Sequence, residues 1–247
     1  QCSRALRIHH RHHTTPMARI KASSSTNWSG YVALTSLTNP LSNSVTNVFG
    51  SWTVPTISKS SVRAFCSIWV GMDGYSNGTA EQIGTEQEWT KGKQVNYAWF
   101  EMYPGPLYHI LGFPVHKNDR VGGQVQFVRT TNGTTTFQLT VFNYTKCVWW
   151  TAPSQYTQSK SAQRNSAEWI VEAPSSTLSG SVLPLAHFSP ITFANCQANI
   201  QNVIGGINDA HWVNDAITMK TTKGVVKAVP SNLSTSGKSF TVTWKHQ

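Results

Sequence analysis

Carboxyl side chains are scarce in this sequence, and they gather where aromatic residues are frequent. The chain has ten acids among 247 residues, and six of the ten lie in three short segments, EQIGTEQEW (81–89), YAWFEMYP (97–104) and AEWIVEAP (167–174). A carboxyl group can take up a proton and return it, so such a set can do acid–base chemistry. A surface that carries both acids and aromatic rings is typical of a substrate groove.

Alternation along a strand predicts which of these side chains point the same way. Residues two apart share one face of a sheet, which groups Glu101 with Trp99 and Tyr103, Glu168 with Glu172, and Gln82 with Glu86. The structural alternative is that these acids lie on the wet face of a half-exposed sheet. Their burial distinguishes the two interpretations.

Other catalytic signatures are missing from the sequence. It has no HExxH, no GxSxG, no paired Asp-Thr-Gly and no glycine-rich phosphate loop. The four cysteines, Cys2, Cys66, Cys147 and Cys196, show no zinc spacing. We therefore expect no metal and no cofactor, and leave one or two disulfides open.

The elements that must hold these residues are strands. Short alternating segments separated by Gly, Pro, Asn and Ser run from 27 to the end, and Asn132-Gly133 predicts a tight hairpin. Charged residues make up only 12% of the chain, which suits sheets better than surface helices. We predict an all-β fold, a sandwich of two antiparallel sheets of the jelly-roll or lectin-like kind. Residues 27–247 would form one domain, preceded at 1–26 by a flexible, basic, His-rich tail or propeptide remnant.

The net charge of +10 does not predict a nucleic-acid partner. Five of the twenty cations lie in the first 21 residues, and the others form no basic stripe. No apolar run is long enough to cross a membrane. Five glycosylation sequons, at Asn27, Asn77, Asn132, Asn143 and Asn232, fit a secreted protein. We expect an extracellular monomer that binds neither nucleic acid nor membrane.

Seven segments, read in order, resemble the glutamic peptidase (eqolisin) family from about residue 27 to the C-terminus. They are NWSG (27–30), SWTVP (51–55), WVGMDG (69–74), EQIGTE (81–86), AWFEMYP (98–104), AEWIVEAP (167–174) and FSPITFANC (188–196). The resemblance implies a sandwich of two long antiparallel sheets. It also implies an endopeptidase that acts on proteins or peptides in acid without a metal.

The resemblance assigns roles residue by residue. It makes Gln82 and Glu172 the catalytic pair, and it places five further residues in or beside the substrate groove: Trp69, Asp73, Trp99, Glu101 and Tyr103. Glu168 remains the rival catalytic acid, because alternation puts it on the same face as Glu172. The sequence departs from the family pattern at Ala173-Pro174, where Asp-Phe is common, and at Tyr97, where some members have Asp. Both departures bear on substrate preference and pH optimum.

Two other functions remain open at this stage. A jelly-roll glycoside hydrolase could use Glu101 and Glu172, and a lectin-like sandwich could stack its aromatic rings on sugars without catalysis. A separate hypothesis is that the cationic leader docks against the acidic groove and inhibits the enzyme until acid weakens the contact.

Overall fold

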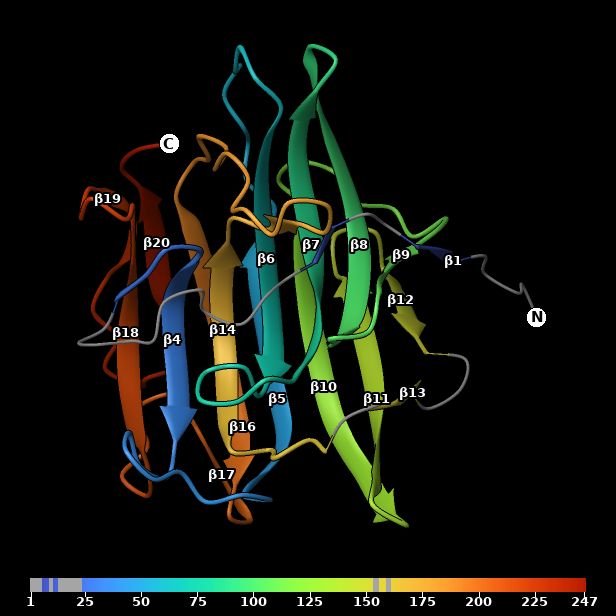
Figure 1. Cartoon of the computed structure of the whole chain (residues 1–247), viewed down its shortest axis with the longest axis vertical. Helices are drawn as coiled ribbons and strands as arrows, with labels where there is room; N and C mark the ends of the chain where they lie inside the picture. Colours follow the sequence, from blue (N-terminus) through green and yellow to red (C-terminus); the bar gives the residue numbers. More distant parts are fainter. Residues whose placement is uncertain (1–5, 9–10, 13–23, 153–155, 159–160) are drawn as a thin grey trace.

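The protein is a sandwich of two antiparallel sheets (Figure 1). The computed structural model describes residues 6–8, 11–12, 24–152, 156–158 and 161–247. Within these residues every regular element is a strand. No helix long and apolar enough to span a membrane occurs in this part of the chain.

The front sheet carries the residues singled out above. Its strands follow the order β18–β4–β14–β6–β7–β8–β9–β1, and each neighbouring pair is antiparallel. Their bounds are β18 (Val213–Lys220), β4 (Trp28–Leu34), β14 (Ser166–Glu172), β6 (Ala64–Met72), β7 (Ala80–Thr90), β8 (Lys93–Tyr103), β9 (Leu107–Ile110) and β1 (Leu6–Ile8).

The back sheet has β5 between β10 and β16, and it joins the front sheet along one edge. Strand β18 pairs with β4 in front and with β19 behind, so the two layers are continuous at that side. The remaining strands are β3 (Ser24–Ser25), β5 (Val45–Thr53), β10 (Arg120–Thr131), β11 (Thr134–Asn143), β12 (Val148–Thr151), β13 (Tyr156–Thr157), β16 (Ile191–Ile200), β17 (Val203–Gly205), β19 (Val226–Pro230) and β20 (Phe240–Trp244). A separate two-stranded ladder pairs β2 (Arg11–His12) with β15 (Ser175–Ser176).

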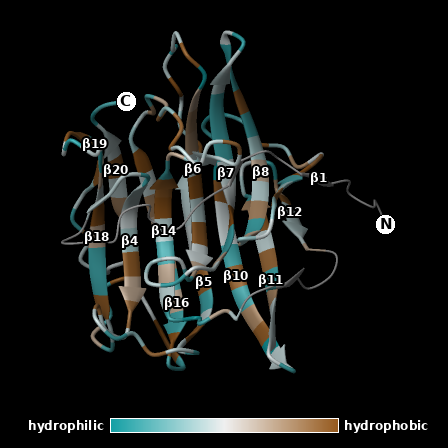
Figure 2. Cartoon of the chain, in the orientation of Figure 1, coloured by the Kyte–Doolittle hydropathy of each residue, from teal (hydrophilic) through white to brown (hydrophobic). Residues whose placement is uncertain are grey.

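Alternating side chains fill the space between the sheets. Figure 2 shows hydrophobic and hydrophilic residues alternating along strands such as β14 and β16. Trp169 points inward, where its indole donates to the carbonyl of Phe49 on the back sheet at 2.9 Å. A second apolar cluster, with Trp28, Trp69 and Trp99, covers the outer face of the front sheet. Every residue of β6 and β14 is buried, so the central front strands are enclosed on both faces.

The strands expected from sequence are all present, including the hairpin. Asn132 and Gly133 have φ values of 50° and 76° and connect β10 to β11 through the Thr131–Thr134 pair. These positive values are what a two-residue turn requires and glycine tolerates. Strand β18 was not among the expected segments; it carries Asp215 at one of its buried positions, where the carboxyl group accepts a 2.9 Å bond from the Tyr75 hydroxyl.

The described cysteines form no disulfide. Cys66 and Cys196 are buried free thiols and Cys147 is an exposed one, whereas Cys2 lies outside the described residues.

Candidate active site

The outer face of the front sheet collects the acid and amide side chains into three cross-strand rows. Strand registers define the rows Glu172–Ser67–Glu86–Tyr97, Ile170–Trp69–Gly84–Trp99 and Glu168–Gly71–Gln82–Glu101, each read in the order β14, β6, β7, β8. Gln82, Glu101, Glu168 and Glu172 therefore share one face, as strand alternation predicts.

These acids are not on a wet surface. Glu101, Glu168, Glu172 and Gln82 each have 0% exposure, and Glu86 has 1%. The structural alternative for them is thus wrong. A buried carboxyl group needs hydrogen-bond partners or a proton, so this face is chemically specialised.

Among the described residues, Glu172 accepts hydrogen bonds from two N–H donors. The indole Nε1 of Trp69 donates to Oε2 at 2.9 Å, and Nδ2 of Asn27 donates to Oε1 at 3.2 Å. Burial raises the pKa of Glu172 well above its ordinary value; the Trp69 bond opposes this shift, the charge of Glu101 adds to it, and the Asn27 bond opposes it. The carboxyl group therefore titrates at a higher pH than an exposed glutamate.

The indole of Trp69 extends from Glu172 toward Gln82. A Cβ placed on Gly71 would lie 3.0 Å from Cζ3 of Trp69 and 3.2 Å from Cβ of Gln82, so the six-membered ring covers Gly71 beside Gln82. The Nε1 side of the same ring system contacts Glu172. Trp28 packs edge-on against Trp69, with ring centroids 4.9 Å apart, which limits rotation of the indole.

Gln82 is oriented by its cross-strand neighbour. Its Nε2 donates to Oε2 of Glu101 at 3.3 Å. Gln82 and Glu172 are separated by two strands laterally and by four residues along the strand, which places their backbones on the order of 15 Å apart. Only long side chains that converge above Trp69 can act on the same small group.

Glu168 is nearer to Gln82 in register than Glu172 is. It stands in the same row, with only Gly71 between them. Neither carboxyl oxygen of Glu168 has a hydrogen-bond donor within geometric range among the described residues. Burial raises the pKa of Glu168 well above its ordinary value, the side chain of Ser166 opposes the shift, and Asp73 and Glu81 add to it. Its surroundings suit a protonated acid.

The other residues expected in the groove divide into two groups. Trp99 is buried in the same row as Trp69, with Gly84 between them. Tyr103 is partly exposed at the end of β8, where burial and the charge of Glu101 raise its pKa. Asp73 instead follows β6 and accepts bonds from backbone N–H groups of Arg164 and Asn165. Asp73 therefore ties chain segments together at the end of the sheet.

Two polar contacts on this face escaped the sequence analysis. Asn27 bonds Glu172, and the hydroxyl of Ser67 donates to the carboxylate of Glu86. In the sequence, Asn27 belongs to the family landmark NWSG but has no assigned role. Its contact with Glu172 could not be predicted, because the two residues are 145 positions apart. Buried Asn27 is also unsuited to glycosylation in the folded chain, as is buried Asn143, whereas Asn132 and Asn232 are exposed.

The fold is an all-β sandwich, and this face of its front sheet gathers buried acid and amide side chains. A family model described as the Peptidase A4 family matches residues 26–244. The chain belongs to this family, the glutamic peptidases or eqolisins, and is a glutamic endopeptidase.

Solved structures with the same fold include three fungal-type glutamic peptidases. Scytalido-glutamic peptidase with a transition state analog inhibitor aligns with a TM-score of 0.72 at 21% identity, covering 89% of this chain and 98% of that one. SCP-B in a complex with the tripeptide Ala-Ile-His gives 0.67 at 20% identity over 89% and 98%. Aspergilloglutamic peptidase from Aspergillus niger gives 0.59 at 26% identity over 74% and 99%. No curated protein sequence matches the chain.

Proposed function

We propose that the chain is an acid-favoured endopeptidase in which Glu172 and Gln82 act together on one peptide bond and one water molecule. The observation that carries the proposal is that both side chains lie on the same buried face, at the two ends of the Trp69 indole. We therefore expect the carboxyl group of Glu172 and the amide of Gln82 to act on the same peptide group, bound above Trp69.

Glu172 supplies the proton transfer. Its carboxylate takes a proton from water as the water attacks the scissile carbonyl, and the resulting carboxylic acid returns that proton to the leaving amine. Such a group works best when its pKa is near the operating pH. Burial raises the pKa of Glu172, and the N–H donors of Trp69 and Asn27 keep the carboxylate form accessible.

Gln82 stabilises the negative charge that develops on the carbonyl oxygen. An amide does not titrate, so it can position the water and donate a hydrogen bond at any pH. The bond from Gln82 to Glu101 fixes the direction of the amide before substrate arrives. Loss of one such donor typically lowers the rate by about 10²- to 10³-fold.

The surrounding residues give the groove its substrate class. Trp69, Trp99 and Glu101 are buried on the face of the proposed pair, and Tyr103 is partly exposed at the end of β8. These suit a protein or peptide substrate bound by a secreted, monomeric enzyme. Tyr97, on the same face, contacts His109 with ring centroids 4.3 Å apart and ring planes tilted by 41°.

Two substitutions test the catalytic pair. Glu172→Ala and Gln82→Ala should each abolish cleavage of a denatured protein substrate assayed between pH 2 and 8, while circular dichroism shows an intact fold. Glu168→Gln should retain activity, since an amide mimics the neutral acid that we assign there. Glu88→Gln is the matched control, because Glu88 lies on β7 with Gln82 but is paired with Arg63. Full activity in either alanine variant would refute the pair, and loss confined to Glu168→Gln would move the acid role to Glu168.

No observation in the described residues favours the two alternatives. A glycoside hydrolase pair needs carboxyl groups about 5 to 9.5 Å apart, whereas Glu101 and Glu172 are three strands and four residues apart, and Glu101 accepts a bond from Gln82. Membership of a peptidase family likewise argues against a lectin without catalysis. Release of reducing sugar from glucans by the same preparation would reopen the question.

A further inference from the structure

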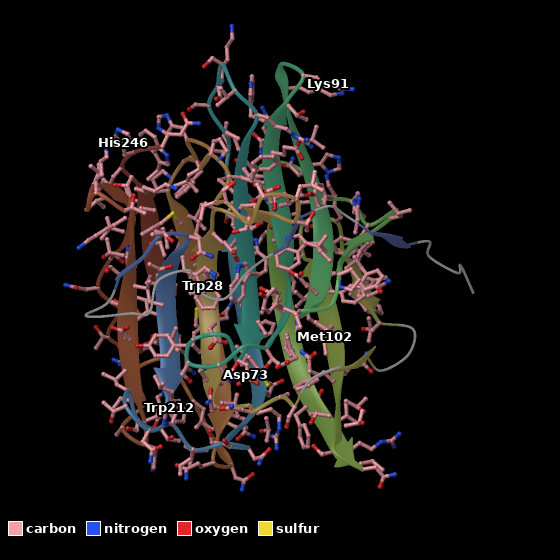
Figure 3. The ribbon with its side chains drawn as sticks, in the orientation of Figure 1. Trp28, Asp73, Lys91, Met102, Trp212 and His246 are labelled. Carbon is pink, nitrogen blue, oxygen red and sulfur yellow. The ribbon has the colours of Figure 1, made fainter. Side chains whose placement is uncertain are left out.

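A second group of acids lies where β6 ends and β7 begins, at the end of the front sheet where Figure 3 labels Asp73. Asp73 directly follows β6, and Glu81 is the second residue of β7, immediately before Gln82. Both side chains are completely buried. The proposed chemistry does not use either carboxyl group.

Asp73 has the surroundings of a carboxylate. It accepts hydrogen bonds from the backbone N–H groups of Arg164 at 2.8 Å and Asn165 at 3.0 Å, and from Nδ2 of Asn77 at 2.9 Å. The hydroxyl of Thr79 is a fourth donor at 3.4 Å. Both oxygens of Asp73 therefore act as hydrogen-bond acceptors.

Glu81 has the surroundings of a carboxylic acid. Its Oε1 accepts a bond from Nε2 of Gln158 at 2.7 Å, but no N–H or O–H donor among the described residues reaches Oε2. A second buried carboxylate beside Asp73 would be costly. Glu81 is opposite Met72, the residue before Asp73, and its carboxyl group is within hydrogen-bonding reach of Asp73, to which it can donate once protonated. Burial, followed by the charge of Asp73, raises the pKa of Glu81 well above its ordinary value.

The other charged groups around Glu81 do not remove this requirement. Glu168, on β14, is a further buried acid. Arg164 lies ahead of β14 and is close enough to both acids that, although burial lowers its pKa, the charges of Asp73 and Glu81 act to raise it. Its guanidinium donates to the carbonyl of Val45 and to Asn43 and lies 3.6 Å over the Phe127 ring. On β8, Glu101 belongs to the opposite face of the sheet, and Tyr103 presents its backbone carbonyl.

The Glu81 contacts connect the strand ends that hold the catalytic amide. Gln158 uses the same Nε2 to donate to the carbonyl of Tyr103 at 3.0 Å, so Glu81, Gln158 and Tyr103 link β7 to β8. Asp73 links the end of β6 to the segment that enters β14. Gln82 and its partner Glu101 lie next to these links.

We infer that Glu81 is a positioning residue: as a carboxylic acid that donates to Asp73, it fixes the start of β7 and with it Gln82, and its ionisation ends that positioning as pH rises. The inference rests on the proposed role of Gln82 and adds a structural cause for an upper pH limit.

The sign of the pH dependence follows from proton binding. Glu81 keeps its proton to higher pH in the folded protein than in the unfolded chain, where the ordinary value is 4.5. The stability that this contact contributes is therefore complete below about pH 4.5 and is lost as pH rises through the raised pKa of the folded state.

Two variants at Glu81 and one control test the inference. Glu81→Gln supplies an N–H donor to Asp73 that does not titrate, so its thermal unfolding midpoint should fall less between pH 4 and 8 than that of the wild type. Its upper limb of kcat against pH should move upward by about one unit or more. Glu81→Leu removes the donor at every pH and should lower kcat in acid about tenfold or more with little change in KM. Glu88→Gln removes the ion pair with Arg63 instead, and it should leave the profile of kcat against pH as in the wild type.

The outcomes separate this inference from the peptidase proposal. Parallel pH profiles for the wild type and Glu81→Gln, in unfolding and in kcat, would overturn the inference, as would failure of Glu81→Gln to fold at pH 4. If the wild type cleaves no peptide at any pH, the proposed function fails. The unfolding profiles still decide whether Glu81 holds a proton against Asp73.

Discussion

A single indole organises the candidate active site at the scale of individual residues. Trp69 donates to Glu172, covers Gly71 beside Gln82 and is braced edge-on by Trp28. An N–H donor to a carboxylate stabilises the charged form. Trp69 therefore has two roles, because it fills the centre of the face and its hydrogen bond opposes the rise in the pKa of Glu172.

Substitution of this indole should change the pH profile of the enzyme. Trp69→Phe keeps an aromatic ring but removes the donor to Glu172, so the pKa of Glu172 should rise further. A hydrogen bond to a charged group is worth about 1.5 to 3 kcal/mol, which corresponds to roughly one to two pH units. The acid limb of kcat/KM should move upward by that amount, measured on a peptide substrate between pH 2 and 8.

The control for this prediction is Trp89→Phe, near the far end of the same strand that carries Gln82. Its profile should coincide with that of the wild type. An unshifted acid limb in Trp69→Phe, together with normal folding, would mean that the indole acts on Glu172 only through packing.

Sequence predicted which residues share the catalytic face but not how they are ordered across it. A period of two puts Glu168 and Glu172 on one side, and it cannot say which of them is level with Gln82. That depends on strand register, which places Glu168 in the row of Gln82 and Glu172 in the row of Glu86. Asn27 was missed for the same reason, since its contact with Glu172 joins distant strands.

At the scale of elements, the close approach of β7 to the backbone of β6 requires glycine. A Cβ on Gly84 would lie 2.2 Å from the carbonyl oxygen of Ile68 and 2.6 Å from Cβ of Trp69. The backbone of β6 cannot yield cheaply, because both of its faces are packed. Gly84 thus allows β7 to lie against the Trp69 position.

Gly84→Ala should consequently destabilise the fold and disturb the site. Overpacking of this kind costs typically about 1 to 3 kcal/mol, measurable as a lower denaturant midpoint in acid. Gly78→Ala is the matched control, because nothing lies within 4 Å of a Cβ there. Equal midpoints for the two variants would show that β7 can shift away from Trp69 without cost.

The elements themselves were predictable where side-chain type and burial agree. The segments that became β4, β6, β8 and β14 alternate or are continuously apolar, and turn residues bound them. Strand β18 differs, because it has a charged residue, Asp215, at a buried position. The carboxyl group of Asp215 accepts a hydrogen bond from Tyr75, which lies in a distant loop. A polar residue in a buried strand position becomes intelligible only when its distant partner is known.

At the scale of the whole molecule, the distribution of acids favours stability in acid. Burial raises the pKa of Glu81, Glu168 and Glu172. The folded state therefore binds protons more tightly than the unfolded chain at these positions, and stability should fall as pH rises above about 4.5. The positioning role inferred for Glu81 is the local expression of this general property.

The leader of the chain pairs with two strands of the folded domain, β9 and β15. Strand β1 pairs with β9, with Arg7 opposite His109, and His109 in turn is opposite Trp99. Further along the leader, β2 (Arg11–His12) pairs with Ser175 and Ser176, just beyond Glu172. The two leader strands thus attach to elements that flank the candidate active site, which accords with the hypothesis that the leader restrains the enzyme.

Removal of residues 1–23 tests that hypothesis. The truncation retains Ser25, whose hydroxyl bonds Asn27 at 2.8 Å, and it retains the whole family match, which starts at residue 26. The shortened protein should fold and cleave peptides without an activation lag, with higher kcat/KM than the full chain at pH 5 to 6, where the leader contact has not been weakened by acid. Identical progress curves for both proteins across this range would exclude inhibition by the leader. A synthetic peptide of residues 1–23 should inhibit the shortened enzyme in trans, with weaker inhibition at lower pH as the carboxyl groups of the candidate active site become protonated.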